Sequence, residues 1–180
     1  EFLDFYAAMK ERASDRLAVH GVKFVNDGSY PSMTLRLNFP GYLDGETGLT
    51  GEIPWPDMVE RMLPFWENGI QIHSHANGDE TVDMTLDTLN AMQNLAPRFD
   101  HRFTIEHFGL STPEQVRRMA SLGALASVNP NYVFELGYAY WQNLVGFERA
   151  AQMSRCGSLV RHNIPTTLHS DFTMAPAQPL

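Results

Sequence analysis

The sequence has almost no cysteine and no long hydrophobic run. Cys156 is the single cysteine among 180 residues, so no disulfide can form within the chain. A lone thiol fits a reducing compartment, and we predict a cytoplasmic protein. The longest stretch without a charged residue, 119–134, contains serine, asparagine and proline, which argues against a membrane-spanning helix there.

Basic residues are also scarce. The chain carries 13 Lys and Arg against 21 Asp and Glu, which gives a formal net charge of −8. This charge repels phosphate backbones and anionic lipid surfaces, so we expect neither a nucleic acid nor a membrane as a partner. With 43% hydrophobic and 19% charged residues the composition is that of a folded domain, and we expect a small molecule as the substrate.

Short apolar runs alternate with amphipathic stretches along the chain. The apolar runs predict five β-strands, at 21–25, 70–75, 102–107, 124–128 and 166–170. The stretches between them predict helices at 56–67, 79–95, 112–121 and 146–162. Thr112 followed by Pro113 is typical of a helix start, and Gly69 and Gly123 stand where helices end. This alternation indicates an α/β fold with a parallel sheet.

Two longer segments break the alternation. Residues 38–54 contain four glycines and two prolines, and residues 130–143 are rich in tyrosine and other aromatic side chains. We predict both as loops that cover a site, because long ordered loops in α/β domains often do so. Their aromatic character and few charges indicate an apolar or aromatic group on the substrate.

Polar residues stand at or near the carboxyl ends of the predicted strands, where a parallel sheet places its active site. These residues are Lys23, His75, His107 and Asp171. An imidazole that ends a buried strand needs a partner, because an unsatisfied buried polar group costs about 1 to 3 kcal/mol. Two neutral imidazoles and a carboxylate suit zinc or a similar divalent ion and leave positions open for water and substrate.

Four motifs at these positions resemble those of the amidohydrolase superfamily, family 3. They are Val-Lys-Phe-Val-Asn-Asp-Gly-Ser at 22–29, His-Ala-Asn-Gly-Asp at 75–79, Ile-Glu-His at 105–107 and Ser-Asp at 170–171. Each motif alone is weak, but all four occur in the family's order, and the resemblance covers nearly the whole chain. It implies a (β/α)8 TIM-type barrel, of which the five strands correspond to strands four to eight. The single segment 1–180 is then the C-terminal portion of the barrel of a longer enzyme.

The resemblance also implies roles for the strand-end residues. His75 and His107 are the implied metal ligands, and Lys23 is a further ligand that can be carbamylated. Asp171 is the implied metal ligand and catalytic residue that moves protons. The implied activity is hydrolysis of carbon–nitrogen bonds of an amide-like, non-peptide kind by a metal-activated water, with zinc as the expected metal.

The sequence departs from the family pattern in one main respect. The family begins with a His-x-His pair on its first strand, and nothing before Lys23 supplies one. The pair His73-Ser-His75 has too few metal-ligating strands after it to be that first pair. We therefore expect the 180 residues alone to have little activity and to self-associate through the exposed barrel edges.

One other class of function stays open at this stage, and a third is disfavoured. His169 stands where the family commonly has a small residue, and together with the missing pair it fits a non-catalytic or regulatory protein of the same fold. A metal-free binding module of the flavodoxin-like class would need a glycine-rich phosphate loop after the first strand, which this sequence lacks.

Several other polar residues have simpler interpretations. Asp27 and Asp79 are predicted to stabilise a turn and a helix start, and His73 to have a structural role near the ligands. The remaining histidines outside strand ends are predicted at the surface, and the methionines at helical spacing in the core: His20, His101 and His162; Met58, Met62, Met84 and Met92.

Overall fold

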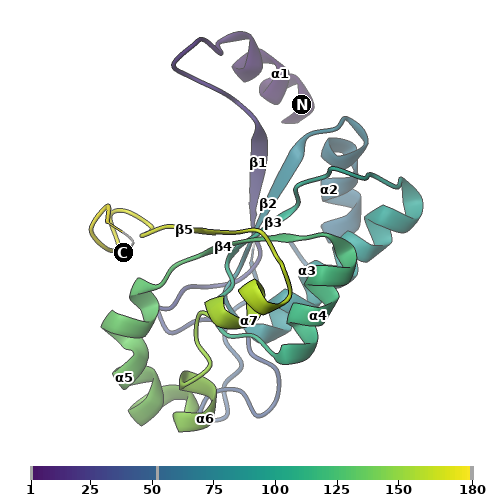
Figure 1. The fold of residues 1–180 in the computed structure, drawn as a ribbon. Helices are drawn as coiled ribbons and strands as arrows, with labels where there is room; N and C mark the ends of the chain where they lie inside the picture. Colours follow the sequence, from purple (N-terminus) through teal and green to yellow (C-terminus); the bar gives the residue numbers. More distant parts are fainter. Residues whose placement is uncertain (1, 52, 179–180) are drawn as a thin grey trace.

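The computed structural model describes residues 2–51 and 53–178. Five parallel strands form one sheet in the order β1–β2–β3–β4–β5 (Figure 1). Their bounds are Gly21–Val25, Gln71–Ala76, Thr104–His107, Leu125–Val128 and Thr166–Leu168. Each strand pairs in parallel with the next one along the chain. The predicted α/β fold with five parallel strands is therefore confirmed, and β1 and β5 are the two edges of the sheet.

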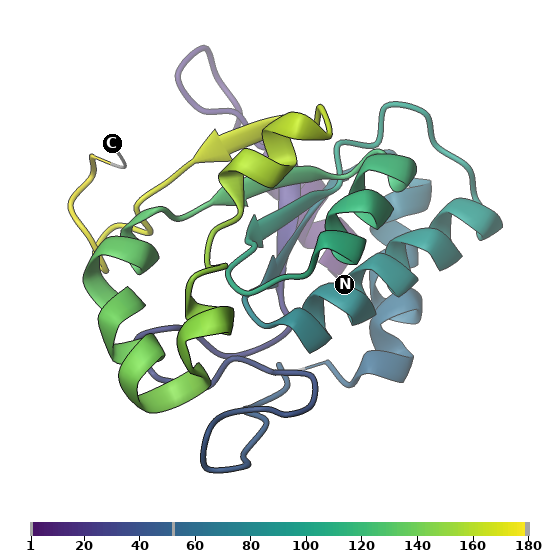
Figure 2. The same ribbon diagram turned by 60° about the horizontal axis from the view of Figure 1, so that its bottom comes forward.

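Three helices lie side by side on one face of this sheet (Figures 1 and 2). They are α2 (Met58–Glu67), α3 (Asp79–Leu95) and α4 (Pro113–Leu122), and the short turn η1 (Trp55–Asp57) precedes α2. The Thr112 side chain accepts the N–H of Gln115 at the start of α4, and Gly123 ends that helix with a left-handed φ of 71°. These local signals explain why the sequence predicted the three helices well.

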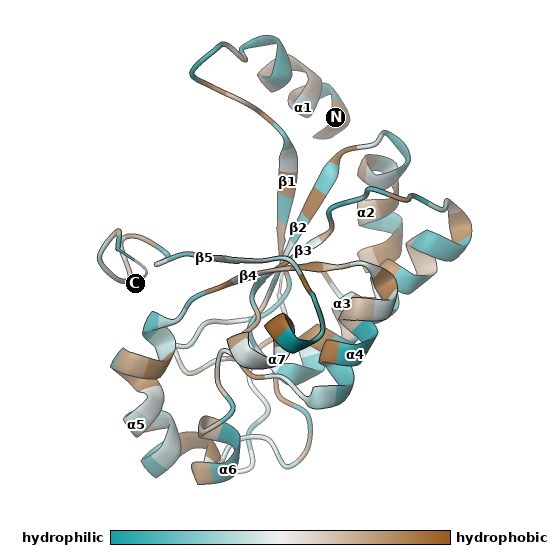
Figure 3. Ribbon diagram, viewed as in Figure 1, coloured by the Kyte–Doolittle hydropathy of each residue, from teal (hydrophilic) through white to brown (hydrophobic). Residues whose placement is uncertain are grey.

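The main core lies between this face and the three helices. Trp66, Leu86, Ile105, Val116 and other side chains there are fully buried, and hydrophobic residues recur along the strands and helices that meet (Figure 3). Met58, Met62 and Met92 are buried in it as predicted, and Met84 is partly buried. Burial of one such side chain contributes about 1.5 to 3 kcal/mol, so this core fixes the strands that carry the site.

Residues 132–145 are helical, so the prediction of a loop at 130–143 was wrong. The segment consists of η2 (Tyr132–Leu136), α5 (Gly137–Ala139) and η3 (Tyr140–Val145), of which η2 and η3 are π-helical. Its tyrosines pack on Tyr30, with ring centroids 4.4 Å away for Tyr132 and 4.7 Å for Tyr140. Contacts with a distant part of the chain therefore stabilise this structure, and they form a second, smaller core.

Residues 38–51 and 53–54 contain no helix or strand, as predicted for this loop, apart from one bridge between Asp27 and Thr50. The loop lies beside α5 and α6 (Phe147–Ala150), away from the row of α2, α3 and α4 (Figure 2). Tyr42 from this loop and Leu37 just before it are buried in the second core. The loop and the segment 132–145 therefore pack as one unit.

The single helix predicted at 146–162 is two short helices, α6 (Phe147–Ala150) and α7 (Cys156–Arg161). Ser154 lies between them with a left-handed φ of 49°. Its N–H donates to the carbonyl of Gly109 at 2.9 Å and its hydroxyl to the carbonyl of Asn129 at 3.1 Å. These two bonds to other loops stabilise a backbone conformation that a helix does not allow. At the other end of the chain, α1 (Phe2–Glu11) precedes β1.

His101 is buried, with 3% of its surface exposed, so its predicted place at the surface was wrong. Its Nε2 donates to the carbonyl of Leu122 at 2.9 Å, and its Nδ1 accepts the N–H of Phe103 at 2.9 Å. The ring lies 5.1 Å from that of Trp66. His20 and His162 are exposed, as predicted. Among the described residues, none of the helices has the length and apolar character that a membrane span requires.

Candidate active site

A cavity of about 440 Å³ opens at the carboxyl ends of the strands. It is lined by polar side chains from all five strands or the turns that follow them: Lys23, His73, Glu106, His107, Ser127, His169, Ser170 and Asp171, with Phe172. A larger cavity of about 740 Å³ lies between α1 and β1, but its lining is mainly apolar. Reaction chemistry needs titratable groups, so the smaller cavity is the candidate site.

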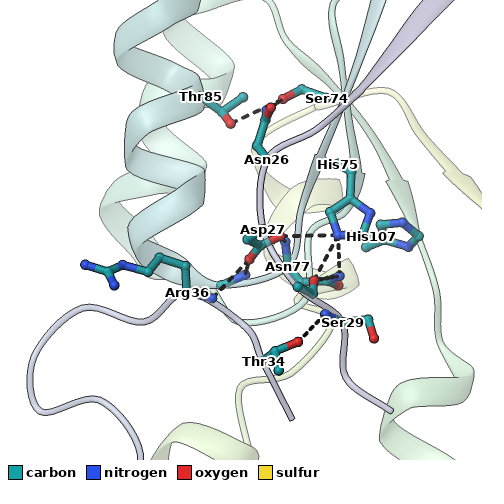
Figure 4. A network of polar contacts seen from close by, with 12 residues as sticks. Asn26, Asp27, Ser29, Thr34, Arg36, Ser74, His75, Asn77, Thr85 and His107 are labelled. Carbon is teal, nitrogen blue, oxygen red and sulfur yellow. Dashed lines mark hydrogen bonds and ion pairs between the residues drawn. The ribbon is translucent and has the colours of Figure 1, made fainter. Parts of the chain in front are cut away.

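His75 is held at the end of β2 by the turn that follows β1 (Figure 4). Its Nε2 lies 2.9 Å from the carbonyl oxygen of Gly28 and 3.3 Å from Oδ1 of Asp27. The amide Nδ2 of Asn77 also lies 3.1 Å from Nε2, but it donates to the carbonyl of Gly28 at 3.0 Å. The two acceptors, one of them a carboxylate, therefore place the proton on Nε2 and the lone pair on Nδ1. Nδ1 has no hydrogen-bond partner among residues 2–51 and 53–178. His75 therefore presents one free imidazole nitrogen.

Asp27 fixes the turn that holds His75. It is buried, and its carboxylate accepts the N–H groups of Asn77 at 3.0 Å, Gly78 at 2.8 Å and Arg36 at 3.2 Å (Figure 4). The first two lie just before α3, where a negative charge is favourable. The prediction of a turn-stabilising carboxylate is confirmed for Asp27.

Asp79 has the comparable role that the sequence predicted, at the first residue of α3. Its carboxylate accepts the N–H of Asn38 at 3.0 Å and pairs with Arg149 at 2.9 Å. Burial raises the pKa of Asp79 above its ordinary value, and the charge of Arg149 opposes this effect. These contacts connect the start of α3 to the loop at 38–54 and to α6.

His107 ends β3 and is 2% exposed. Its φ of 72° is left-handed, which is uncommon for a residue with a side chain. Its ring lies 4.5 Å from that of His75 and 5.0 Å from that of His169, centroid to centroid. Its Nδ1 is 3.1 Å from Nε2 of His169 and 3.3 Å from the hydroxyl of Tyr132. The strained backbone and the close rings are typical of a functional site.

Two histidines of the cavity, His107 and His169, have pKa values below the ordinary one. Burial, followed by the charges of His75, His169 and Lys23, lowers the pKa of His107 to about 2. Burial also lowers the pKa of His169, although Glu106 opposes this effect. Neutral imidazole is the form that binds metal ions, so the electrostatics of the cavity favour coordination.

Lys23 and Asp171 line the same cavity from its two sides. Lys23 lies within β1 opposite His73, two residues before the level of His75. Asp171 follows β5, is exposed and has a left-handed φ of 51°. The fold therefore brings Lys23, His107 and Asp171 to one cavity, with the His75 ring against that of His107.

These residues fit a divalent ion in part. His75 and His107 supply two imidazole rings in contact, and imidazole nitrogens are among the ligands that zinc prefers. Within the described ranges, however, no three His, Cys, Asp or Glu side chains are grouped closely enough to hold an ion. A third ligand has to come from Lys23 or from a movement of Asp171, both of which line the cavity.

Glu106 is a cavity residue that the sequence reasoning did not single out. Its Oε1 accepts Nδ1–H of His73 at 2.6 Å. Burial by itself raises the pKa of Glu106, but the hydrogen bonds from His73 and Ser127 outweigh it and lower the pKa below its ordinary value. The alternation of side chains along a strand could have indicated Glu106 from the sequence. His73, His75 and Glu106 share one face of the sheet.

Comparison with known proteins places this site in a family. The model of the amidohydrolase family matches residues 1–180. The protein LONG AFTER FAR-RED 3 of Arabidopsis thaliana is 31% identical over 169 residues, which are 93% of this chain and 29% of that protein.

Two solved structures share the fold. An uncharacterized metal-dependent hydrolase from Pyrococcus furiosus is 26% identical with a TM-score of 0.81, over 98% of this chain and 36% of that one. One from Pyrococcus horikoshii is 23% identical with a TM-score of 0.79, over 98% and 35%. The chain thus spans about a third of the length of the known proteins that it matches. Its sheet and helices match a partial barrel of metal-dependent hydrolases, and the chain belongs to the amidohydrolase family.

Proposed function

We propose that this chain is the metal-binding part of a hydrolase that cleaves carbon–nitrogen bonds of amide-like, non-peptide small molecules. One observation carries the proposal: the imidazole rings of His75 and His107 lie 4.5 Å apart beside a polar cavity in a chain of the amidohydrolase family. A metal-dependent hydrolase of the same fold supports it.

Zinc is the proposed ion, because imidazole nitrogens are among its preferred ligands. His75 and His107 would hold it, and Lys23, as the free amine or as a carbamate, would be a further ligand. When bound, such an ion lowers the pKa of water to about 7 and polarises a carbonyl group. Its binding also gives the two imidazoles the partners that buried polar groups require.

Asp171 is the proposed proton carrier. It stands at the mouth of the cavity, where water and substrate both have access. Its carboxylate takes a proton from the attacking water as the oxygen bonds to the carbonyl carbon. It then gives that proton to the leaving nitrogen as the carbon–nitrogen bond breaks. The exposed Phe172 next to it offers a surface for an apolar group of the substrate.

A non-catalytic protein with the same fold is the second candidate. The observation that favours it is the incomplete donor set, since the described residues do not group three metal-ligating side chains. The two candidates differ in whether the full-length protein holds a divalent ion and turns over a substrate. A cytoplasmic location and self-association of the 180 residues stay predictions, to be tested by fractionation of cells and by the mass in solution.

The test uses the full-length protein. Its metal content is measured after purification, and a panel of N-acyl and amide small molecules is assayed before chelation, after chelation and after zinc is returned. We expect hydrolysis of at least one class, its loss with the metal and its recovery with zinc. A folded protein without bound metal and without turnover would exclude the hydrolase and support the second candidate.

A further inference from the structure

A continuous series of polar contacts runs along the wall of the cavity from Glu106 to His107. The hydroxyl of Ser127 on β4 lies 2.8 Å from Nδ1 of His169. The same Nδ1 is 3.8 Å from Oε2 of Glu106. Nε2 of His169 then lies 3.1 Å from Nδ1 of His107. Neither the family motifs nor the proposed mechanism gives His169 a role.

The carboxylate sets the direction of the first hydrogen bonds in this series. Oε2 of Glu106 lies 3.8 Å from Nδ1 of His169, and a carboxylate oxygen beside a ring nitrogen favours a proton on that nitrogen. The 2.8 Å contact is therefore donation from Nδ1–H of His169 to the oxygen of Ser127.

The direction of this hydrogen bond also determines which ring nitrogen of His107 carries the proton. A neutral His169 that is protonated at Nδ1 has a lone pair at Nε2, so Nε2 accepts a proton from Nδ1 of His107 across 3.1 Å. His107 then carries its proton at Nδ1 and its lone pair at Nε2. Its Nε2 has no hydrogen-bond partner in the parts of the chain that the structure describes.

We propose that His169 is a positioning residue that fixes His107 in the Nδ1–H form, so that Nε2 of His107 is the nitrogen left to bind the ion. This inference rests on the proposed function, because it concerns the ligand of that metal site. Residues that fix the tautomer of a metal-binding imidazole typically change metal affinity about 10- to 100-fold when they are lost.

Tyr132 is the competing partner of the same nitrogen. Its hydroxyl lies 3.3 Å from Nδ1 of His107 and can donate to it, which would place the proton of His107 at Nε2 instead. The contact with His169 is the shorter one, at 3.1 Å. The two arrangements predict opposite tautomers, so a measurement of the tautomer separates them.

The first experiment is magic-angle-spinning NMR of the full-length, metal-free protein labelled with 15N-histidine. The His107 signals are identified by their absence from the H107Q variant. We expect a protonated Nδ1 and an unprotonated Nε2 in His107. A protonated Nε2 would overturn the assignment, and this measurement requires no variant of His169 to fold.

The second experiment changes His169 to phenylalanine, which keeps a ring of similar size and removes the acceptor. We expect the Nδ1–H form of His107 to lose its dominance and zinc affinity to fall about 10- to 100-fold. H162F is the matched control, because His162 is exposed, and it should change neither quantity. If H169F does not fold, S127A tests the same series with a smaller expected shift. An unchanged tautomer and affinity in the folded variant would overturn the proposal.

The outcomes also separate this inference from the proposed function. A protein that binds no divalent ion but shows the Nδ1–H form, lost in H169F, would refute the hydrolase and support His169 as a positioning residue. A zinc-dependent hydrolase whose His107 is protonated at Nε2 would refute the role of His169 and leave the proposed function intact.

Discussion

Leu86 and His107 are both buried, but different forces hold them in place. Leu86 lies on α3 among apolar side chains of the main core, and its helix is marked in the sequence by a repeating pattern. His107 lies at the carboxyl end of β3, has a left-handed backbone and is in contact with His75, His169 and Tyr132. The helix-covered face thus depends on hydrophobic burial, whereas the carboxyl ends depend on a few directional contacts between distant residues.

This contrast predicts that the two regions respond differently to substitution. Changes on the helix-covered face should lower the free energy of unfolding and leave the metal site intact. Changes at the carboxyl ends should affect metal and activity more than stability, because neutral polar groups at the cavity contribute little to folding.

Removal of either proposed imidazole ligand should have the largest effect. In the full-length protein, H75A and H107A should each lose bound zinc and hydrolase activity together, by more than 100-fold, because a donor is removed outright. Zinc content and turnover are measured side by side. The control is H20A, since His20 is exposed. Full zinc content in both ligand variants would contradict the assignment.

Truncation of Leu86 should lower the stability of the fold and leave zinc binding unchanged. L86A removes a fully buried side chain from α3, which should cost about 2 to 5 kcal/mol in the free energy of unfolding. Denaturant unfolding measures that change, and zinc content per folded chain should stay at the wild-type value. L95A is the control, because Leu95 is 63% exposed on the same helix. Equal losses in the two variants would mean that α3 does not cover the core as described.

Removal of the His73 side chain should have an intermediate effect on zinc affinity. H73A leaves the Glu106 carboxylate without its 2.6 Å hydrogen bond, so we expect zinc affinity to fall about 10- to 100-fold. H73Q, which can still donate a hydrogen bond, should recover part of the loss. Titration of the chelated protein with zinc provides the affinities. A loss in H73A as large as that in H107A would make His73 a ligand and not a supporting residue.

His101 should make a small, pH-dependent contribution to stability. Burial lowers the pKa of His101 below its ordinary value of 6.5, so the unfolded chain binds the proton more readily than the folded one. The stabilisation is complete above pH 6.5 and is lost as the pH falls toward the lowered value, by about 1.4 kcal/mol per pH unit at most. Unfolding at several pH values should show a weaker pH dependence for H101Q than for wild type. Parallel curves would contradict the burial of this ring.

Much of the helix-covered region could be predicted from the sequence because its signals are local. The strands are short apolar runs, α2 and α3 have apolar residues at helical spacing, and Thr112 with Gln115 forms the cap that begins α4. Each signal lies within a few residues of the structure it determines. The resemblance to the family placed Lys23, His75, His107 and Asp171 in order along the strands.

The rest of the structure depends on contacts between distant residues, which no local sequence pattern predicts. The segment 132–145 is helical where its tyrosines meet Tyr30, and the hydroxyl of Tyr140 donates to the Tyr30 carbonyl 110 positions away. Strand alternation places His107 and Glu106 on opposite faces, and the left-handed φ at His107 changes the direction of the chain there. His101 is buried because Leu122 and Phe103 satisfy both of its ring nitrogens.

The most direct test is X-ray diffraction from crystals of the full-length protein, with data collected at the absorption edge of its bound metal. We predict an anomalous peak about 2.1 Å from Nδ1 of His75 and from Nε2 of His107, the two nitrogens that have no protein partner among the described residues. A peak at another site, or a zinc-loaded crystal without a peak between these two rings, would contradict the proposed metal centre.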